Sequence, residues 1–376
     1  MELYPWEKSA YIELVSLYNK FYKRLAELGK ECYRIDSHML FSNNVKDLTY
    51  EQEQQIRNYW KNYTDDFDIN YHRYYIDRTE QFDVRFIPDD IFAGYIDGYL
   101  NNRAIEAGIS DKNYMDLYLS GFKMPTTFIH LINGIFEDAS YRIVTRDNAI
   151  KHLVQTGRFI VKPSMATYGG KGCYLFYNPT YEEIDAYLNE VDCDNLIFQE
   201  IVEQHEMTAL LHPKSLNTIR IMTLLLEGEI KVLSAAFRMG VGESHVDNAS
   251  KGGIYCKILS NGTLSDYAYD ALGNRFDEHP DGGLFSEIKF EFMDKVQALV
   301  MQAAQRFPHF RLIGWDIAID KNSVPVIIEA NLTMSGMDVI ETICGPLFGE
   351  YTECILDEVF HHNKKKGMSV DLLQYI

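Results

Sequence analysis

The stretch GWDIAIDKNSVPVIIEANL, residues 314–332, decides the fold class of this chain. Two apolar runs flank the turn residues Lys321-Asn322-Ser323, a pattern that predicts a β-hairpin. With the turn centred on Asn322-Ser323, the numbers of paired residues sum to 645, which places Asp316 opposite Glu329. Glu329 and Asn331 are two residues apart on one strand, so both side chains point to the same face.

The side chains of Asp316, Glu329 and Asn331 form a candidate metal site. Two carboxylates placed opposite each other repel unless a cation lies between them. Carboxylate and amide oxygens are the donors that Mg²⁺ prefers, and Mg²⁺ leaves its other positions to water and substrate phosphates. The alternative is an exposed acidic hairpin, which the apolar neighbours on both strands disfavour.

A second informative region carries arginines on predicted strands. Thr218, Arg220 and Met222 share one face of an otherwise apolar strand, and Arg238 ends the strand that follows. Because a buried unpaired charge is very costly, these arginines either converge on a polar site or form structural salt bridges. The stretch NASKGG, residues 248–253, comes next.

A third region has the composition of a phosphate-binding loop. The strand FIVKP, residues 159–163, carries Lys162 near its end, and the turn YGGKGC, residues 168–173, follows. Glycines let backbone N–H groups approach phosphate oxygens, and lysines add positive charge, although an ordinary hairpin turn has the same composition. Together the three regions supply cations for phosphates and a metal platform, which is what phosphoryl transfer from a nucleotide requires.

The overall composition argues against several classes of protein. The chain has 376 residues and is 46% hydrophobic, enough for a large core in two or three domains. Its 55 acidic and 36 basic residues give a net charge of −19, which disfavours binding to nucleic acid or to an anionic membrane surface. No apolar run reaches the ~20 residues of a membrane span, and no signal-peptide pattern opens the sequence. Six cysteines without CxxC spacing are expected to be free thiols, so we expect a cytoplasmic protein.

The arrangement of predicted elements indicates an α+β chain with a helical first part. Residues 1–90 lack strand signals, and apolar residues from Tyr11 to Leu28 recur at helical spacing. Further on, short β-branched and aromatic runs alternate with helical stretches. The predicted strands are 126–131, 158–162, 173–177, 195–199, 218–226, 230–237, 253–259, 312–320 and 326–332. The predicted helices lie near 89–106, 145–156, 180–191, 284–306 and 336–361.

The order of these motifs resembles the ATP-grasp superfamily, and most closely its sugar-transfer associated ATP-grasp proteins. The resemblance covers about residues 85–360 and rests on QEIVEQHEM, LNTIRIMT, VDNASKGGI and IEANL at 199–207, 216–223, 246–254 and 328–332. The set of arginines and acids is also similar to the glutamate ligases that modify ribosomal proteins. The resemblance implies an ATP-grasp fold, in which two α+β lobes with antiparallel sheets hold ATP between them, preceded by a mainly helical N-terminal segment. It implies a helical region at 1–90, a lead-in at 91–140, a small lobe with a glycine-rich lid loop at 141–203, and a large lobe with the metal and acyl-phosphate site at 204–376.

The resemblance also implies a role for each matching residue. The first phosphate lysine stays open: Lys112 is a candidate, and Lys123 lies too close to Pro125. Glu206 fits the spacing of the acid that holds the ribose hydroxyls best, and Glu203 competes with it. The implied nucleotide-binding residues are Lys112, Lys162, Gly169, Gly170, Lys171, Gly172, Gln199, Glu200, Ile201, Val202, Glu203 and Glu206. The implied catalytic residues are Arg220, Arg238, Asn248 and Lys251, and two Mg²⁺ ions would bind Asp316, Glu329 and Asn331.

These observations predict an ATP- and Mg²⁺-dependent carboxylate–amine ligase. It would form an amide or similar bond through an acyl phosphate, in polysaccharide or secondary-metabolite biosynthesis. Its expected partners are a small-molecule carboxylate and an amine, with saccharide-linked molecules among the candidates. The alternatives are an ATP-dependent kinase on the same fold and a nucleotide-binding protein without catalysis. The sequence leaves the two substrates and the oligomeric state open.

Overall fold

Two structural units divide the chain in the computed structural model. The structure describes residues 45–165, 172–248 and 251–361, together with scattered positions between residues 9 and 33. The first unit takes residues 1–104, 309–312 and 333–376, and the second takes residues 105–308 and 313–332. The predicted helix face between Tyr11 and Leu28 lies largely outside the described residues. No helix in the described ranges has the length and apolar character needed to cross a membrane.

The first unit is helical, with an aromatic core. Its described helices are α2 (Tyr50–Trp60), α3 (Asn70–Thr79), α4 (Asp89–Ile91), the π-helix η1 (Phe92–Ile96), α5 (Asp97–Leu100), α12 (Met337–Cys344), the 3₁₀ turn η5 (Gly349–Tyr351) and α13 (Thr352–Phe360). Thr49 and Gln52 form a reciprocal capping box that starts α2. Tyr75 stacks on Phe86 with ring centroids 5.5 Å apart, and both side chains are buried. Helices from the two ends of the sequence meet here, because α12 packs against α3.

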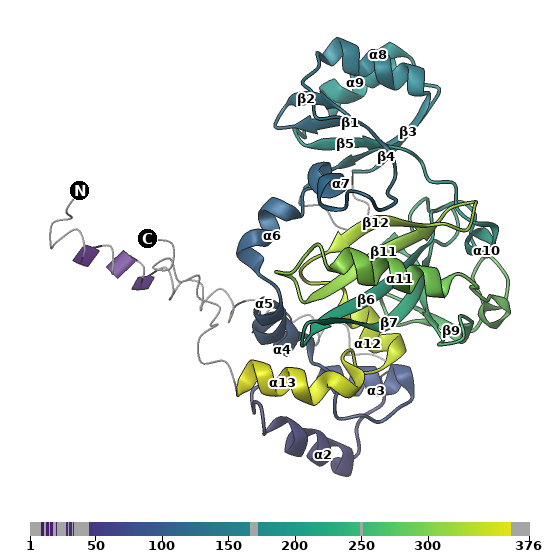
Figure 1. Cartoon of the computed structure of the whole chain (residues 1–376). Coiled ribbons are helices and arrows are strands. Elements are labelled where there is room, and N and C mark those ends of the chain that lie inside the picture. The colour runs from purple at the N-terminus through teal and green to yellow at the C-terminus, as the bar shows by residue number, and fades with distance from the viewer. Residues whose placement is uncertain are drawn as a thin grey trace. The chain divides into compact units, whose positions relative to one another are not determined.

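The second unit contains a five-stranded antiparallel sheet in the order β2-β1-β5-β3-β4. Its strands are β1 (Thr127–Ile132), β2 (Ile135–Asp138), β3 (Arg158–Pro163), β4 (Tyr174–Tyr177) and β5 (Leu196–Gln199). Helices α8 (Arg146–Thr156) and α9 (Tyr181–Glu190) lie together beside this sheet (Figure 1). Apolar residues of α8, α9 and the strands, such as Leu153, Ile184 and Phe198, form one buried core. The short elements α6 (Arg103–Ile109), η2 (Lys112–Tyr114) and α7 (Met115–Tyr118) precede β1.

A larger antiparallel sheet of seven strands, ordered β10-β9-β8-β7-β6-β11-β12, completes this unit. Its strands are β6 (Thr218–Leu226), β7 (Glu229–Met239), β8 (Ile254–Ile258), β9 (Leu264–Asp270), β10 (Arg275–Phe276), β11 (Leu312–Ile319) and β12 (Pro325–Asn331). The helix α11 (Met293–Ala304) packs against β6, β7 and β12, and the short elements α10 (Glu206–Ala209) and η4 (Phe285–Glu287) lie in connections. The α+β class and the two antiparallel sheets agree with the prediction.

Both predicted hairpins form. Glu227 and Gly228 have φ values of 51° and 83°, the left-handed conformations that a tight turn between β6 and β7 requires. In the second hairpin Asp316 pairs with Glu329, Trp315 with Ala330 and Gly314 with Asn331, which confirms the predicted register. Nearer the turn the register shifts, because Ile317 pairs with Ile327 and leaves Ile328 as an extra residue.

The structure differs from the sequence prediction at several elements. Strands β2, β9 and β10 were not predicted, and β1 and β2 join the small sheet although the expected small lobe began at residue 141. The predicted helix at 284–306 forms only as η4 and α11, because Phe290 N donates to Gly262 O and holds the segment between them extended. The predicted helix at 336–361 breaks at Gly345, whose φ of 95° ends α12 before Pro346. The predicted helix at 89–106 contains the π-helix η1 and is interrupted at Asn101, which bridges to Phe310.

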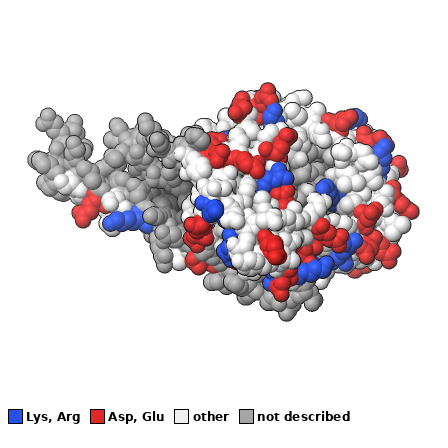
Figure 2. Space-filling view, turned by 90° about the horizontal axis from the view of Figure 1, so that it is seen from below, with Lys and Arg blue, Asp and Glu red and all other residues white. Residues whose placement is uncertain are grey.

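Acidic side chains are widely distributed on the surface. On the face shown in Figure 2, Asp and Glu side chains are spread among Lys and Arg side chains, and the described residues form no broad basic area there. This agrees with the net charge of −19.

Candidate active site

The candidate site is centred on the hairpin of β11 and β12. Asp316 and Glu329 are direct cross-strand partners, so their side chains lie on the same face of the sheet. The Asp316 side chain is only 9% exposed, whereas that of Glu329 is 34% exposed. Asn331 lies two residues beyond Glu329, and its Nδ2 donates to Gly314 O at 3.0 Å and lies 3.5 Å from Asp316 Oδ2. The three predicted metal-binding residues therefore lie together.

Two arginines converge on Asp316. Arg220 Nε and Nη2 donate to Oδ1 and Oδ2 of Asp316 at 2.6 and 3.1 Å. Arg238 Nη1 donates to Oδ1 of the same carboxylate at 2.9 Å. Arg220 lies on β6, Arg238 on β7 and Asp316 on β11. Both arginines can reach Asp316 because β6 lies between β7 and β11 in the sheet. The sequence left two alternatives for these arginines, a shared polar site or structural salt bridges. Both descriptions apply, because the arginines form their ion pairs with Asp316, which is itself a predicted site residue.

The electrostatics of this group favour ionised side chains. Burial would raise the pKa of Asp316, but the charges and hydrogen bonds of Arg220 and Arg238 outweigh it and lower the pKa to about 2. Burial would likewise lower the pKa of Arg238, but Asp247 and Asp316 raise it above its usual value. Asp316 is therefore a carboxylate at neutral pH, as a ligand of a hard cation must be.

Asp247 is a residue of this group that the sequence analysis missed. Its Oδ1 accepts from Arg238 Nη2 at 3.3 Å, and its Oδ2 accepts from the backbone N of Thr218 at 3.1 Å and from the Thr218 hydroxyl. Burial raises the pKa of Asp247, and Arg238 and Thr218 partly offset the rise. A physical signal was present, because a buried second arginine needs its own carboxylate partner and Asp247 adjoins the predicted Asn248.

Lys112 forms an ion pair with the other candidate metal ligand. Lys112 Nζ lies 2.9 Å from Glu329 Oε1, and the backbone N of Lys112 donates to Ser164 O at 3.0 Å. The competitor Lys123 instead pairs with Asp320 at 2.5 Å. Lys112, and not Lys123, therefore lies beside the candidate metal ligands.

The adjoining residue Asn113 anchors this turn. Its side chain is fully buried, with Oδ1 3.1 Å from Nδ1 of His130 and Nδ2 donating to Leu131 O at 3.3 Å. Asp111 Oδ1 accepts from the Asn113 backbone N at 2.9 Å and caps η2. The turn that presents Lys112 is thus fixed to β1.

Lys162 lies on β3, close to Lys112 and Cys173. Burial lowers the pKa of Lys162, and the charge of Lys112 lowers it further, while Cys173 and Glu329 oppose the change. Lys162 forms no ion pair with another described residue. Of the predicted lid residues, Gly169, Gly170 and Lys171 lie outside the described residues. Gly172 has a φ of 80°, and a Cβ there would meet Pro163 Cγ at 2.8 Å, so this position requires glycine.

The predicted adenine hinge follows β5. The Gln199 side chain is buried and donates to Thr127 Oγ1 at 3.2 Å, and Glu200 Oε2 accepts from the Thr126 hydroxyl at 2.8 Å. Both side chains are thus held by β1 and the residue before it. Ile201 and Val202 continue the chain towards α10 and are partly exposed.

The two candidate ribose acids differ in their partners. Both oxygens of the Glu203 carboxylate already have cationic partners, because Arg158 donates to Oε1 at 2.8 Å and Lys321 donates to Oε2 at 2.7 Å. Glu206 is exposed at the start of α10 and has no side-chain partner among the described residues. Glu206 therefore stays the prediction for the ribose hydroxyls.

Asn248 and Lys251 lie in the loop between β7 and β8. Asn248 O accepts from the backbone N atoms of Lys251 and Gly253 at 2.9 and 3.1 Å, and the Lys251 side chain is exposed. A Cβ at Gly253 would lie 2.5 Å from Asp247 O, so this loop depends on glycine to pass close to Asp247. The loop thus begins beside the arginine–carboxylate group.

The residues fit a divalent metal and a nucleotide. Asp316, Glu329 and Asn331 offer oxygen donors of the kind that Mg²⁺ prefers, and both carboxylates already face cations. Lys112 and Lys162 supply positive charge at the same end of the hairpin. No group of three or more His, Cys, Asp or Glu side chains in the described ranges is arranged to hold a metal ion. A metal here would rely on two carboxylates, an amide and its substrate's phosphates.

Comparison with protein families gives a match over most of the chain. The model of the family described as "Sugar-transfer associated ATP-grasp" matches residues 93–346, which is more than half of the sequence. The chain belongs to this sugar-transfer associated ATP-grasp family. Enzymes of the ATP-grasp type use ATP and generally Mg²⁺. The ATP-grasp fold predicted from the motifs is therefore confirmed by the family match together with the two antiparallel sheets.

Solved structures with ligase names are similar to parts of this chain at low identity. An L-amino acid ligase from Bacillus licheniformis is 14% identical, with 68% of this chain and 48% of that chain covered and a TM-score of 0.39. The D-alanine-D-alanine ligase from Coxiella burnetii is 11% identical, with 70% and 62% covered and a TM-score of 0.41. The chain thus spans about half to two thirds of the length of these two proteins. A comparison with curated proteins gave no match.

Proposed function

We propose that this chain is an ATP- and Mg²⁺-dependent carboxylate–amine ligase of the ATP-grasp family. The observation that carries the proposal is the shared site on β11 and β12. There two facing carboxylates, Asp316 and Glu329, are each paired with cations of the kind that phosphate groups would engage. A kinase or a binding protein would need the same nucleotide site, so the acceptor chemistry is the part that experiment must decide.

On the nucleotide side, Lys112 and Lys162 would hold the phosphates and Glu206 would hold the ribose. Asp316, Glu329 and Asn331 would hold Mg²⁺, which when bound neutralises phosphate charge and orients the γ-phosphate. Lysines suit this role because their ammonium groups act as strong point charges for phosphates. The ion pair of Lys112 with Glu329 keeps both side chains near the place where the phosphates would lie.

On the acceptor side, Arg220 and Arg238 would stabilise developing negative charge. In the first step an oxygen of the substrate carboxylate bonds to the γ-phosphorus, and the bond from that phosphorus to the leaving ADP oxygen breaks. In the second step an amine nitrogen bonds to the acyl carbon, phosphate leaves, and the nitrogen loses a proton. The oxyanion formed in between would be stabilised by guanidinium groups already held in place by Asp316 and Asp247. Asn248 and Lys251 would complete this part of the site.

A co-substrate screen tests the proposal. The purified chain with MgATP is offered pairs of carboxylates and amines, and ADP and free phosphate are both measured. Because the family is described as sugar-transfer associated, saccharide-linked acceptors are the first to test. The ligase proposal predicts equal amounts of ADP and phosphate that depend on both substrates together.

Two other outcomes would overturn the proposal. A phosphorylated acceptor with ADP but no free phosphate would identify a kinase. Tight ATP binding without turnover over a broad acceptor screen would identify a nucleotide-binding protein. Thiols belong in the same screen, since a thiol could replace the amine in the second step.

A further inference from the structure

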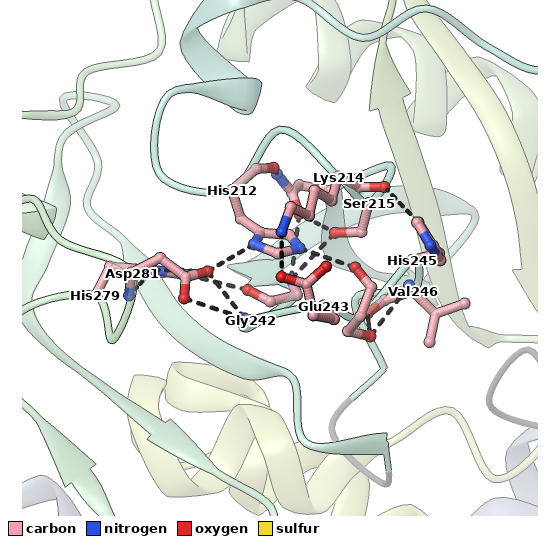
Figure 3. A network of polar contacts seen from close by, with 12 residues as sticks. His212, Lys214, Ser215, Gly242, Glu243, His245, Val246, His279 and Asp281 are labelled. Carbon is pink, nitrogen blue, oxygen red and sulfur yellow. Dashed lines mark hydrogen bonds and ion pairs between the residues drawn. The ribbon is translucent and has the colours of Figure 1, made fainter.

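A buried histidine pair lies beside the loop that leads to Asp247. His212 and His279 are each 1% exposed, and their rings stack with centroids 6.0 Å apart. Asp281 lies next to both of them (Figure 3). None of the proposed nucleotide or metal residues belongs to this group.

Both ring nitrogens of His212 face hydrogen-bond acceptors. Nδ1 lies 2.8 Å from Asp281 Oδ2, and Nε2 lies 2.9 Å from the backbone oxygen of Ser244. A neutral imidazole carries only one N–H, and a carbonyl oxygen cannot donate. The two contacts therefore require one additional proton, which His212 and Asp281 share as an imidazolium–carboxylate pair.

The neighbouring groups place this proton on His212. Burial would raise the pKa of Asp281, but the Gly242 N–H and His212 outweigh it and lower the pKa, so Asp281 is a carboxylate. His279 is neutral, because its Nδ1 accepts from the Asp281 backbone N at 3.1 Å while its Nε2 donates to Gly240 O at 3.0 Å. Burial lowers the pKa of His279, in agreement with that assignment. The other charged groups nearby are the Lys214–Glu243 ion pair and His245, and these side chains are largely exposed.

Through these bonds the pair clamps residues 240–246, the segment that joins β7 to Asp247. Both oxygens of Asp281 accept from Gly242 N, at 3.1 and 2.9 Å, and His212 holds Ser244. The Ser244 hydroxyl in turn bonds to Val246 O at 2.7 Å, directly before Asp247. The segment packs closely on its support, because a Cβ at Gly240 would lie 2.6 Å from Ser215 Oγ. Arg238 comes just before this segment, so both ends adjoin the arginine–carboxylate group.

We propose that His212 and Asp281 form a proton-dependent clamp on residues 240–246 and thereby act as positioning residues for Arg238 and Asp247. Loss of the shared proton leaves His212 able to donate to only one of its two partners. Either Asp281 or Ser244 is then released, and the segment before Asp247 loosens. The inference rests on the proposed function only in that Arg238 and Asp247 serve the acyl-transfer step.

The variant Asp281→Asn separates the proton from the contacts. An asparagine can donate from its Nδ2 to Nδ1 of a neutral His212 and can accept from Gly242 N through its Oδ1, at the 3.1 Å contact, whereas the 2.9 Å contact of Gly242 N with Oδ2 is lost because Nδ2 is a donor. His212 Nε2–H can then still donate to Ser244 O. This variant keeps both His212 contacts and one Gly242 bond without the additional proton. In His212→Gln the N–H groups lie on one atom, Nε2, instead of on the two ring nitrogens that face Asp281 and Ser244, so the geometry of the clamp is lost at every pH.

The test measures the number of ring N–H groups on His212 by ¹⁵N NMR and the hydrogen exchange of residues 240–248, both over a wide range of pH. In the unmodified chain we expect both ring N–H groups at the acid end, and protection that is at least about tenfold lower, beyond the intrinsic pH effect, at any pH where only one ring N–H remains. In Asp281→Asn we expect a neutral His212 and protection that follows the intrinsic effect alone. In His212→Gln we expect low protection throughout, with circular dichroism checking that the variant folds.

Two results would overturn the clamp. One is a single ring N–H on His212 at the acid end, and the other is equal pH dependence of protection in the unmodified chain and in Asp281→Asn. Neither measurement needs ATP or an acceptor, so a failure of the ligase proposal would leave them unaffected. Where turnover is found, kcat of the unmodified chain should fall wherever NMR shows that one ring N–H of His212 is lost, and Asp281→Asn should remove that fall while KM for ATP stays the same.

Discussion

Asp316 joins the two halves of the proposed site, because it is a candidate metal ligand and also the partner of both arginines. Some of the residues around Asp316 could be predicted from the sequence, and others could not. The sequence predicted Glu329 opposite Asp316 from strand pairing alone, since a hairpin with a known turn determines its register. It did not predict that Arg238 also needs Asp247, because loop residues follow no period that a single sequence reveals.

Replacing Arg220 by alanine tests the acceptor side. Arg220→Ala should lower kcat at least ~100-fold, because a donor aimed at developing charge acts mainly in the transition state. The dissociation constant for ATP should change little. Steady-state kinetics and calorimetric ATP binding separate the two effects, and a loss of ATP affinity with unchanged kcat would contradict the assigned role.

The contacts of the Asp247 side chain should contribute to the stability of the folded chain. Asp247→Asn removes the charge that faces Arg238 and should lower the free energy of unfolding by ~2 kcal/mol. Asp266, which is exposed on β9, provides the control through Asp266→Asn. Urea unfolding of the two variants measures the difference. Equal stabilities would show that the Asp247 contacts do not hold the loop.

Among elements, long apolar strands were predicted well and short polar ones were not. β6 was predicted with both of its ends, because its apolar run is bounded by turn residues. β2 carried a signal that was overlooked, since Asn133 and Gly134 take φ values of 50° and 77° in a tight turn after β1. β9 and β10 offered no such signal, because β9 is rich in Asp, Ser and Tyr and β10 has two residues. Their strand conformation depends on pairing in the sheet next to β8.

Two turn glycines allow a matched pair of substitutions. Gly172 lies in the turn before β4, and Gly228 lies in the turn between β6 and β7. Gly172 and Gly228 have φ values of 80° and 83°, but only Gly172 lies against another residue, Pro163. Gly228→Ala should cost ~1 kcal/mol of stability from its backbone conformation alone. Gly172→Ala should cost at least ~1 kcal/mol more because of the added contact. Chemical unfolding curves compare the two, and an equal cost would mean that Pro163 moves away freely.

At the scale of the whole molecule, the chain combines an ATP-grasp unit with a helical unit built from both ends of the sequence. The sequence predicted a helical region at 1–90, and the described part of it contains the helices α2 and α3. It did not predict that α12 and α13 would group with them, because contacts between distant helices leave no local pattern. The acidic net charge is likewise a property of the whole surface and says little about the site, where Lys112, Arg220 and Arg238 provide the local positive charge.

A buried acid in the helical unit should make stability depend on pH. Glu341 is fully buried, and its Oε1 accepts from the backbone N atoms of Ile87 and Leu347, while its Oε2 has no hydrogen-bond partner in the part of the chain that the structure describes. Burial raises the pKa of Glu341 well above its usual value, with the two backbone bonds opposing the rise. Its raised pKa therefore contributes stability below the pKa of the unfolded chain, and this contribution is lost as the pH rises towards the folded pKa.

The neutral substitution Glu341→Gln should remove this dependence. The variant should be more stable than the unmodified chain at neutral pH by ~1–3 kcal/mol and should show little difference at acid pH. Unfolding free energies measured across the pH range check this. An unmodified chain that becomes relatively more stable as the pH rises would contradict the assigned direction.

The central claim is that Asp316 and Glu329 hold the metal of an ATP-dependent ligase, and Glu329→Gln tests it most directly. The change keeps the shape of the side chain and removes its charge, while Glu227→Gln in the turn between β6 and β7 serves as the control. Mg²⁺-dependent ATP turnover is measured in both variants over a range of Mg²⁺ concentrations. We predict that Glu329→Gln loses at least ~100-fold of this turnover, or needs far more Mg²⁺, while the control behaves as the unmodified chain. Unchanged Mg²⁺-dependent turnover in Glu329→Gln would contradict the account.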